Sequence, residues 1–278
     1  MIRLGEKQTL VVVKKVEFGV YLAPSMEEVQ DKVLLPVKQV PENAQIGDEI
    51  EVFLYKDSKD RMIATTKEPK LVMGQVAELE VSQVNKFGAF LDWGLEKDLM
   101  LPYKQQLIKV HPGDKVLVTL YIDKSDRLCA TMNVYPALRT DSPYQKEDQV
   151  SGRVYTISDE FGAFVAVDNI YSALIPKKEL YGTVRVGDDI TGRVVEVRSD
   201  GKLNLSIREK AYLQLEKDAE EILAIIDSYD GVLPFNDKVS PEIIKRETGM
   251  SKNGFKRAVG TLLKAGKIEI TEKVIRRL

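Results

Sequence analysis

The chain has 278 residues, with 41 basic and 43 acidic side chains, and it contains no apolar run long enough to span a membrane. This balance excludes a protein that attracts nucleic acid through overall positive charge. The single cysteine, Cys129, cannot form an internal disulfide, and the first residues do not resemble an export signal, so we expect a cytoplasmic protein with no membrane partner.

A motif of phenylalanine, glycine and a second aromatic residue occurs three times along the chain, at residues 17–21, 86–90 and 160–164. Each copy is followed by an apolar pair that ends in proline, and a Gly-Asp pair begins eleven residues after that proline. The prolines are Pro36, Pro102 and Pro176. The spacing after the proline is constant while the loop before it varies, which indicates one structural unit copied three times.

Within each copy, apolar and polar residues alternate, which is the pattern of half-buried β-strands. In the third copy we expect strands at 151–157, 162–167, 173–176, 189–198 and 202–206. One helical turn is expected between the third and fourth strands, and an Asp-Gly turn between the last two. Five short strands arranged in this way predict a small closed barrel of the OB type.

The third copy resembles the S1-type RNA-binding domain of the large ribosomal protein S1, the second copy matches nearly as well, and the first is divergent. The resemblance is carried by Gly152-Arg153-Val154, Phe161-Gly162-Ala163-Phe164-Val165, Leu174-Ile175-Pro176, Val186-Gly187-Asp188 and Leu203-Asn204-Leu205-Ser206. It implies that two aromatic rings and an Asp/Arg pair on each barrel contact single-stranded RNA. The histidine that this family usually carries after the third strand is replaced by proline in every copy.

The resemblance assigns four contact residues to each copy by position. They are Phe18, Tyr21, Asp57 and Arg61 in the first copy, Phe87, Phe90, Asp123 and Arg127 in the second, and Phe161, Phe164, Arg198 and Lys202 in the third. In the third copy the acidic member of the polar pair is lost. Asp60, Asp126 and Asp200, which lie close by in the sequence, are expected to be turn residues.

The aromatic pairs also suggest RNA binding on physical grounds. Exposed rings beside cations stack on bases, and each stacked base contributes roughly 1–3 kcal/mol with little dependence on sequence. Residues three apart on a regular strand face opposite sides, so we expect the glycine between them, such as Gly162, to take a positive φ and turn or bulge the chain. The alternative is that the second ring of each pair belongs to the core.

After the third copy the pattern becomes helical. Ser206 and Glu209 fit a capping box for a helix at 209–227, and further helices are expected from Ser240-Pro241 to Gly249 and from Ser251 to Gly266. Residues 267–278 alternate like a two-stranded hairpin, so this part resembles a winged-helix domain. Lys252, Asn253, Lys256 and Arg257 lie opposite the apolar stripe of the third helix, where they contact nucleic acid or are simply solvated.

In domain order, the chain resembles the bacterial conserved virulence factor B family. The expected fold is mostly β with a C-terminal α/β part: OB-fold barrels at 1–66, 70–133 and 149–208, a linker at 134–148, and a winged helix at 209–278. The linker contains proline, aspartate and serine, which is typical of a hinge. The resemblance implies an RNA-binding post-transcriptional regulator that influences virulence genes where the host is a pathogen.

Nothing in the sequence indicates catalysis. No phosphate-binding loop, nucleophile elbow or paired-acid motif is present, and a chain with one histidine, His111, cannot supply a multi-histidine zinc site. We therefore expect neither an enzyme nor a cofactor. Two other functions stay open: a transcription regulator that binds duplex DNA through the winged helix, and an accessory protein of the ribosome or of a nuclease in RNA decay.

Overall fold

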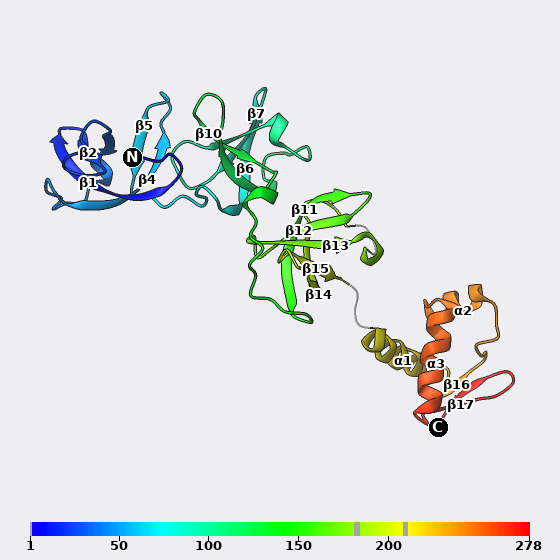
Figure 1. The fold of residues 1–278 in the computed structure, drawn as a ribbon. Helices are drawn as coiled ribbons and strands as arrows, with labels where there is room; N and C mark the ends of the chain where they lie inside the picture. Colours follow the sequence, from blue (N-terminus) through cyan, green and yellow to red (C-terminus); the bar gives the residue numbers. More distant parts are fainter. Residues whose placement is uncertain (1, 181–183, 208–210) are drawn as a thin grey trace. The chain divides into compact units, whose positions relative to one another are not determined.

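The computed structural model describes residues 2–180, 184–207 and 211–278 of the chain (Figure 1). The chain divides into two compact units, residues 1–207 and 208–278. The first unit contains three five-stranded barrels, and the second contains three helices and a small sheet. In the described ranges, no helix is both long enough and apolar enough to cross a membrane.

The first barrel is a closed sheet with the strand order β1-β2-β3-β5-β4. Its strands are β1 (Lys7–Val16), β2 (Gly19–Ala23), β3 (Val33–Pro36), β4 (Glu49–Lys56) and β5 (Met62–Thr65), with a 3-10 turn η1 (Val37–Gln39) between β3 and β4. The inward-facing residues of the alternating strands form its core, as shown by Val12, Leu22 and Leu54, which are fully buried. Burial of this face stabilises the barrel.

The second and third barrels repeat this arrangement. The second, in the order β10-β9-β6-β7-β8, consists of β6 (Val76–Asn85), β7 (Gly88–Asp92), β8 (Leu99–Pro102), η2 (Tyr103–Gln105), β9 (Lys115–Ile122) and β10 (Leu128–Thr131). The third is closed and consists of β11 (Gln149–Ser158), β12 (Gly162–Val167), β13 (Tyr171–Pro176), η4 (Lys177–Glu179), β14 (Asp189–Val197) and β15 (Leu203–Ser206). The predicted fold class is confirmed.

The glycine of each aromatic motif has the expected positive φ and is also required by a close approach of two strands. Gly162 has a positive φ of 121°, but the β-bulge lies between Val154 and Thr156 on the preceding strand, and the other two barrels carry it at the same place. A Cβ on Gly162 would lie 2.1 Å from the carbonyl oxygen of Ile175. Glycine is therefore needed because β12 and β13 approach closely there, and of the two expected forms, a turn or a bulge, the bulge does not lie at the glycine.

Trp93, which follows β7, joins the first two barrels. Its ring packs edge-on against Phe53 and Tyr55 of β4, with centroid distances of 5.6 and 6.3 Å, and its Nε1 donates to the carbonyl of Lys97 at 2.6 Å. All three rings are buried in one apolar cluster that includes the core of the second barrel. The two barrels therefore share a hydrophobic interface.

The segment between the second and third barrels is packed over its first half. Val134 and Leu138 are buried in a cluster with Leu117 of β9 and Tyr155 of β11. The backbone of Arg139 donates to Ile170 at 2.7 Å and accepts from Ser172 at 2.9 Å. These contacts attach residues 134–139 to the barrels. The first half of the linker therefore packs against the barrels, whereas a hinge was expected.

The second unit has the element order of a winged helix. It consists of α1 (Ala211–Ser228), β16 (Val232–Leu233), α2 (Pro241–Thr248), α3 (Lys252–Lys264), β17 (Ile268–Ile270) and β18 (Ile275–Arg277), with the sheet order β16-β18-β17. The Ser251 side chain caps α3 by accepting from Gly254 N at 3.1 Å. The core includes Ile222, Phe255, Leu262 and Ile275.

Ser206, one half of the capping box predicted for the start of α1, has a described contact within the third barrel. Ser206 is the last residue of β15, and its hydroxyl donates to Glu179 Oε2 at 2.8 Å. Its predicted capping partner, Glu209, lies outside the described residues. Ser206 therefore secures the end of the third barrel to the helical turn η4.

Candidate nucleic-acid interface

Each barrel exposes one phenylalanine at the turn between its first two strands. Phe18, Phe87 and Phe161 are 55%, 60% and 55% exposed, although a phenyl ring is usually buried. The ring of Phe87 has the Lys86 Nζ 5.0 Å from its centroid. Three exposed rings at the same place in three barrels form a repeated platform on which bases can stack.

The second aromatic residue of each motif is half-buried rather than fully core. Tyr21, Phe90 and Phe164 lie in β2, β7 and β12. Lys32 Nζ lies 5.4 Å from the centroid of the Tyr21 ring, and the Phe164 ring packs at 6.2 Å against Tyr155. Each of these rings is therefore partly exposed to solvent, three residues after the exposed phenylalanine.

In the first barrel, the predicted polar pair is formed. Arg61 donates from Nε and Nη2 to Asp57 Oδ2 at 3.0 and 2.7 Å, and Asp57 Oδ1 accepts from the backbone amides of Lys59 and Arg61. Partial burial acts to raise the pKa of Asp57, but the hydrogen bonds from Arg61 and the amides outweigh it, so the pKa is lowered. The pair is a hydrogen-bonded, charged feature of the β4–β5 turn.

In the second barrel, the two predicted contact residues do not pair with each other through their side chains. Asp123 accepts from the amides of Ser125 and Arg127, but the Arg127 guanidinium turns to Asp60 of the first barrel, at 2.5 Å. Lys97 Nζ also lies 3.9 Å from Asp60. Asp60 occupies the left-handed region with a φ of 60°, which places its carboxylate at the tip of the turn. The side chains of Asp123 and Arg127 therefore do not pair with each other, and the neighbouring barrel supplies the acid that binds Arg127.

In the third barrel, the turn residue Asp200 supplies an acidic side chain beside the two predicted cations. Asp200 lies 3.3 Å from Arg198 Nε and 3.0 Å from Lys202 Nζ, so it pairs with both predicted cations. Lys202 Nζ also lies 5.5 Å from the centroid of Tyr135, a residue from the connecting segment that the motif comparison missed. Hydrogen bonding to Tyr135 and then to Asp200 raises the pKa of Lys202, which therefore stays protonated.

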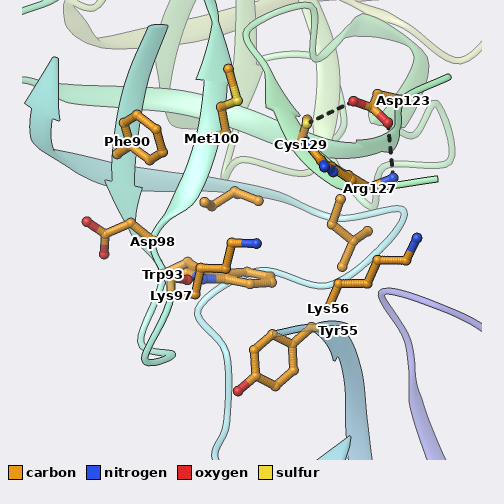
Figure 2. A pocket seen from close by; sticks show the side chains of 12 residues that line it. Tyr55, Lys56, Phe90, Trp93, Lys97, Asp98, Met100, Asp123, Arg127 and Cys129 are labelled. Atoms are coloured by element: carbon orange, nitrogen blue, oxygen red, sulfur yellow. Dashed lines mark hydrogen bonds between the residues drawn. The ribbon is translucent and has the colours of Figure 1, made fainter. Parts of the chain in front are cut away.

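A cavity of about 250 Å³ lies beside Phe90 (Figure 2). It is lined by Tyr55, Lys56, Phe90, Trp93, Lys97, Asp98, Leu99, Met100, Asp123, Arg127, Leu128 and Cys129. Three of the four residues predicted for the second barrel, Phe90, Asp123 and Arg127, are thus brought together, whereas Phe87 stays on the open surface. Burial raises the pKa of the Cys129 thiol to about 11, so the thiol is neutral. The cavity combines aromatic walls with cationic side chains.

The predicted face of the winged helix is partly engaged within its own unit. Lys252 Nζ donates to the carbonyl of Val239 at 2.8 Å, and Lys256 Nζ lies 3.7 Å from Asp237. Asn253 and Arg257 are exposed. This face therefore offers fewer unengaged cations than the sequence suggested. In the described parts of the chain, no group of three or more His, Cys, Asp or Glu side chains is placed to hold a metal ion.

Comparison with protein families accounts for almost the whole chain. The S1 domain matches residues 4–67 and 73–133, the second domain of virulence regulatory factor CvfB matches 137–209, and the CvfB-like winged helix domain matches 220–276. The chain belongs to the conserved virulence factor B family. The family resemblance seen in the sequence is confirmed.

Relatives in this family resemble the chain over most of its length. Protein YitL of Bacillus subtilis is 32% identical over 277 residues, which cover 96% of this chain and 91% of YitL. Conserved virulence factor B of Staphylococcus aureus is 29% identical over 248 residues, which cover 82% of this chain and 81% of that protein. A crystal structure of a multidomain protein with nucleic acid binding domains from Streptococcus pneumoniae aligns with a TM-score of 0.50 and 26% identity, covering 99% of this chain and 98% of that one.

Proposed function

We propose that this protein binds single-stranded RNA through its three S1-type barrels and regulates gene expression after transcription, in the cytoplasm. The observation that carries the proposal is the exposed phenylalanine that recurs at one turn of every barrel, as Phe18, Phe87 and Phe161. Membership of the virulence factor family and likeness to a structure described as having nucleic acid binding domains support it. Control of virulence genes in a pathogen belongs to the same proposal.

The mechanism rests on stacking and on multiple attachment. A base that stacks on an exposed ring contributes roughly 1–3 kcal/mol whatever its identity, and nearby cations neutralise phosphates. Because three barrels lie on one chain, binding of the first raises the effective concentration of RNA at the others, which can increase avidity about 10²–10⁴-fold. The protein would therefore hold unpaired segments of RNA with broad sequence tolerance.

The test is titration of a fluorescein-labelled oligouridylate with the full chain, followed by fluorescence anisotropy. We expect binding that is strongly weakened when Phe18, Phe87 and Phe161 are all replaced by alanine. The matched control replaces Met62, Ile122 and Ile170, which are exposed apolar side chains elsewhere on the same barrels. Equal weakening by both triple variants would show that the rings have no special role, and no binding by the native chain would refute the proposed function.

A second candidate is binding of duplex DNA by the winged helix. It is favoured by Asn253 and Arg257, which are exposed on α3, the helix that enters the major groove in helix-turn-helix proteins. A competition experiment with unlabelled nucleic acids distinguishes RNA binding by the barrels from DNA binding by the winged helix. If unlabelled duplex DNA displaces the labelled RNA more effectively than single-stranded RNA does, the winged helix and not the barrels would be the main binding element. Co-sedimentation with ribosomes without binding of free RNA would instead support an accessory protein.

A further inference from the structure

The residue that follows the repeated proline differs in each barrel. It is Val37 in the first, Tyr103 in the second and Lys177 in the third, and in each case it begins the 3-10 turn after the third strand. The backbone amides of Val37 and Lys177 donate to the carbonyls of Phe18 and Phe161, each at 3.0 Å. This position therefore lies against the turn that carries the exposed phenylalanine.

Two of these side chains also reach the phenylalanine turn. The Tyr103 hydroxyl donates to the carbonyl of Asn85 at 2.6 Å, and Lys177 Nζ donates to the carbonyl of Asp159 at 2.7 Å. Each acceptor lies two residues before the exposed ring of its barrel, so the two contacts are equivalent. Val37 carries no hydrogen-bond donor on its side chain. The second and third barrels thus hold the turn with a side chain that the first barrel lacks.

These side chains give the three turns different surface chemistry. Tyr103 is 50% exposed, so the second barrel presents a second ring close to Phe87. Lys177 is exposed and places an ammonium group close to Phe161. Val37 is 56% exposed and offers only an aliphatic surface beside Phe18. A ring can stack on a further base, whereas an ammonium group can neutralise a phosphate, and an aliphatic side chain does neither.

We propose that the residue after the proline determines which contact each barrel makes with RNA. Tyr103 stacks on a base next to the one on Phe87, Lys177 contacts the phosphate beside the base on Phe161, and Val37 adds little to Phe18. The inference rests on the proposed RNA binding and deepens it, because it makes three similar barrels unequal in strength and in salt dependence. The second barrel is the one that depends most on stacking.

The alternative role for Tyr103 is purely structural, since its hydroxyl holds the turn. Replacing Tyr103 by phenylalanine removes the hydrogen bond and keeps the ring, whereas replacing it by valine reproduces the first barrel and removes both. Stacking predicts that Tyr103→Phe binds nearly as well as the native chain and that Tyr103→Val binds more weakly. If Tyr103 acts only by holding the turn through its hydroxyl, both variants should bind RNA equally weakly.

The experiment is the oligouridylate titration of the full chain at several salt concentrations. We expect Tyr103→Val to weaken binding roughly 5- to 150-fold without changing the dependence on salt, because a lost stacked base releases no counterions. Lys177→Met should flatten the dependence of log affinity on log salt concentration by about 0.7, the value for one contact to a single strand. The reverse change, Val37→Tyr, should tighten binding.

The outcomes separate this inference from the function on which it rests. If the native chain fails to bind the oligouridylate, both are refuted. If the native chain binds but Tyr103→Val binds equally well and Val37→Tyr gains nothing, the inference alone is refuted. Thermal melts of every variant show whether the fold is intact, and Val37→Tyr provides the decisive gain of binding should Tyr103→Val fail to fold.

Discussion

Replacing Asp60 by asparagine should strengthen RNA binding. In the structure, the Asp60 carboxylate accepts from Arg127 and lies 3.9 Å from Lys97, and both cations line the cavity beside Phe90. RNA phosphates that approach this cavity must compete with Asp60 for the two cations. Asparagine tolerates the left-handed backbone of this turn, so the change removes the charge and keeps the conformation.

The size of the effect follows from the exposure of the pair. The side chains of Arg127 and Asp60 are 54% and 41% exposed, so their ion pair is worth about 0.2–1 kcal/mol, as for other exposed pairs. Removing this competition should tighten RNA binding by about 1.4- to 5-fold. Because salt screens exposed pairs, the gain should shrink as the salt concentration rises.

The assay is fluorescence anisotropy with a labelled oligouridylate, and the matched control is Asp126→Asn. Asp126 occupies the same turn of the second barrel with a φ of 54°, and among the described residues its carboxylate takes part in no ion pair. Both variants change the net charge equally. Equal affinity gains would show that only net charge matters, and no gain from Asp60→Asn would show that Arg127 does not contact RNA.

Three further predictions address the third barrel and the single thiol. Phe161→Ala should weaken RNA binding by roughly 1–3 kcal/mol with an unchanged salt slope, whereas Lys202→Ala should flatten that slope by about 0.7; titrations at several salt concentrations distinguish the two. Gly162→Ala should lower the melting temperature far more than Gly187→Ala, because only at Gly162 would a Cβ clash with a neighbouring strand, and circular dichroism would measure both. The raised pKa of Cys129 means that the folded state favours the neutral thiol, so its contribution to stability should be lost as the pH rises from 9.0 to about 11; denaturant unfolding should show a smaller loss over this range for Cys129→Ala than for the native chain.

The barrels and the winged helix could be predicted because their signals are local. Strand alternation, the proline that ends the third strand and the Asp-Gly turn all act within one copy of about 65 residues, and each barrel then completes its own core. The third copy shows this well: its five strands begin and end within two residues of the expected bounds. The hydrogen bond from Ser206 to Glu179 was not predicted, because Glu179 lies 27 residues away in the sequence.

The polar part of the candidate site was harder to predict because it depends on contacts between repeats. Arg61 pairs with Asp57 in the first barrel, but the equivalent Arg127 does not pair with Asp123 in the second. The guanidinium instead finds Asp60, which lies 67 residues away in another barrel. No pattern within a repeat contains that information. The sequence showed that Asp60 is acidic, but it did not show that Arg127 lies beside it.

The contact between each barrel and RNA can be measured by ultraviolet crosslinking of the full chain to an oligouridylate, followed by mass spectrometry of the peptides that carry a nucleotide. The account predicts crosslinks at the exposed turns that carry Phe18, Phe87 and Phe161, with the second and third turns more heavily labelled than the first. Crosslinks confined to α3 of the winged helix, with all three turns unlabelled, would contradict it.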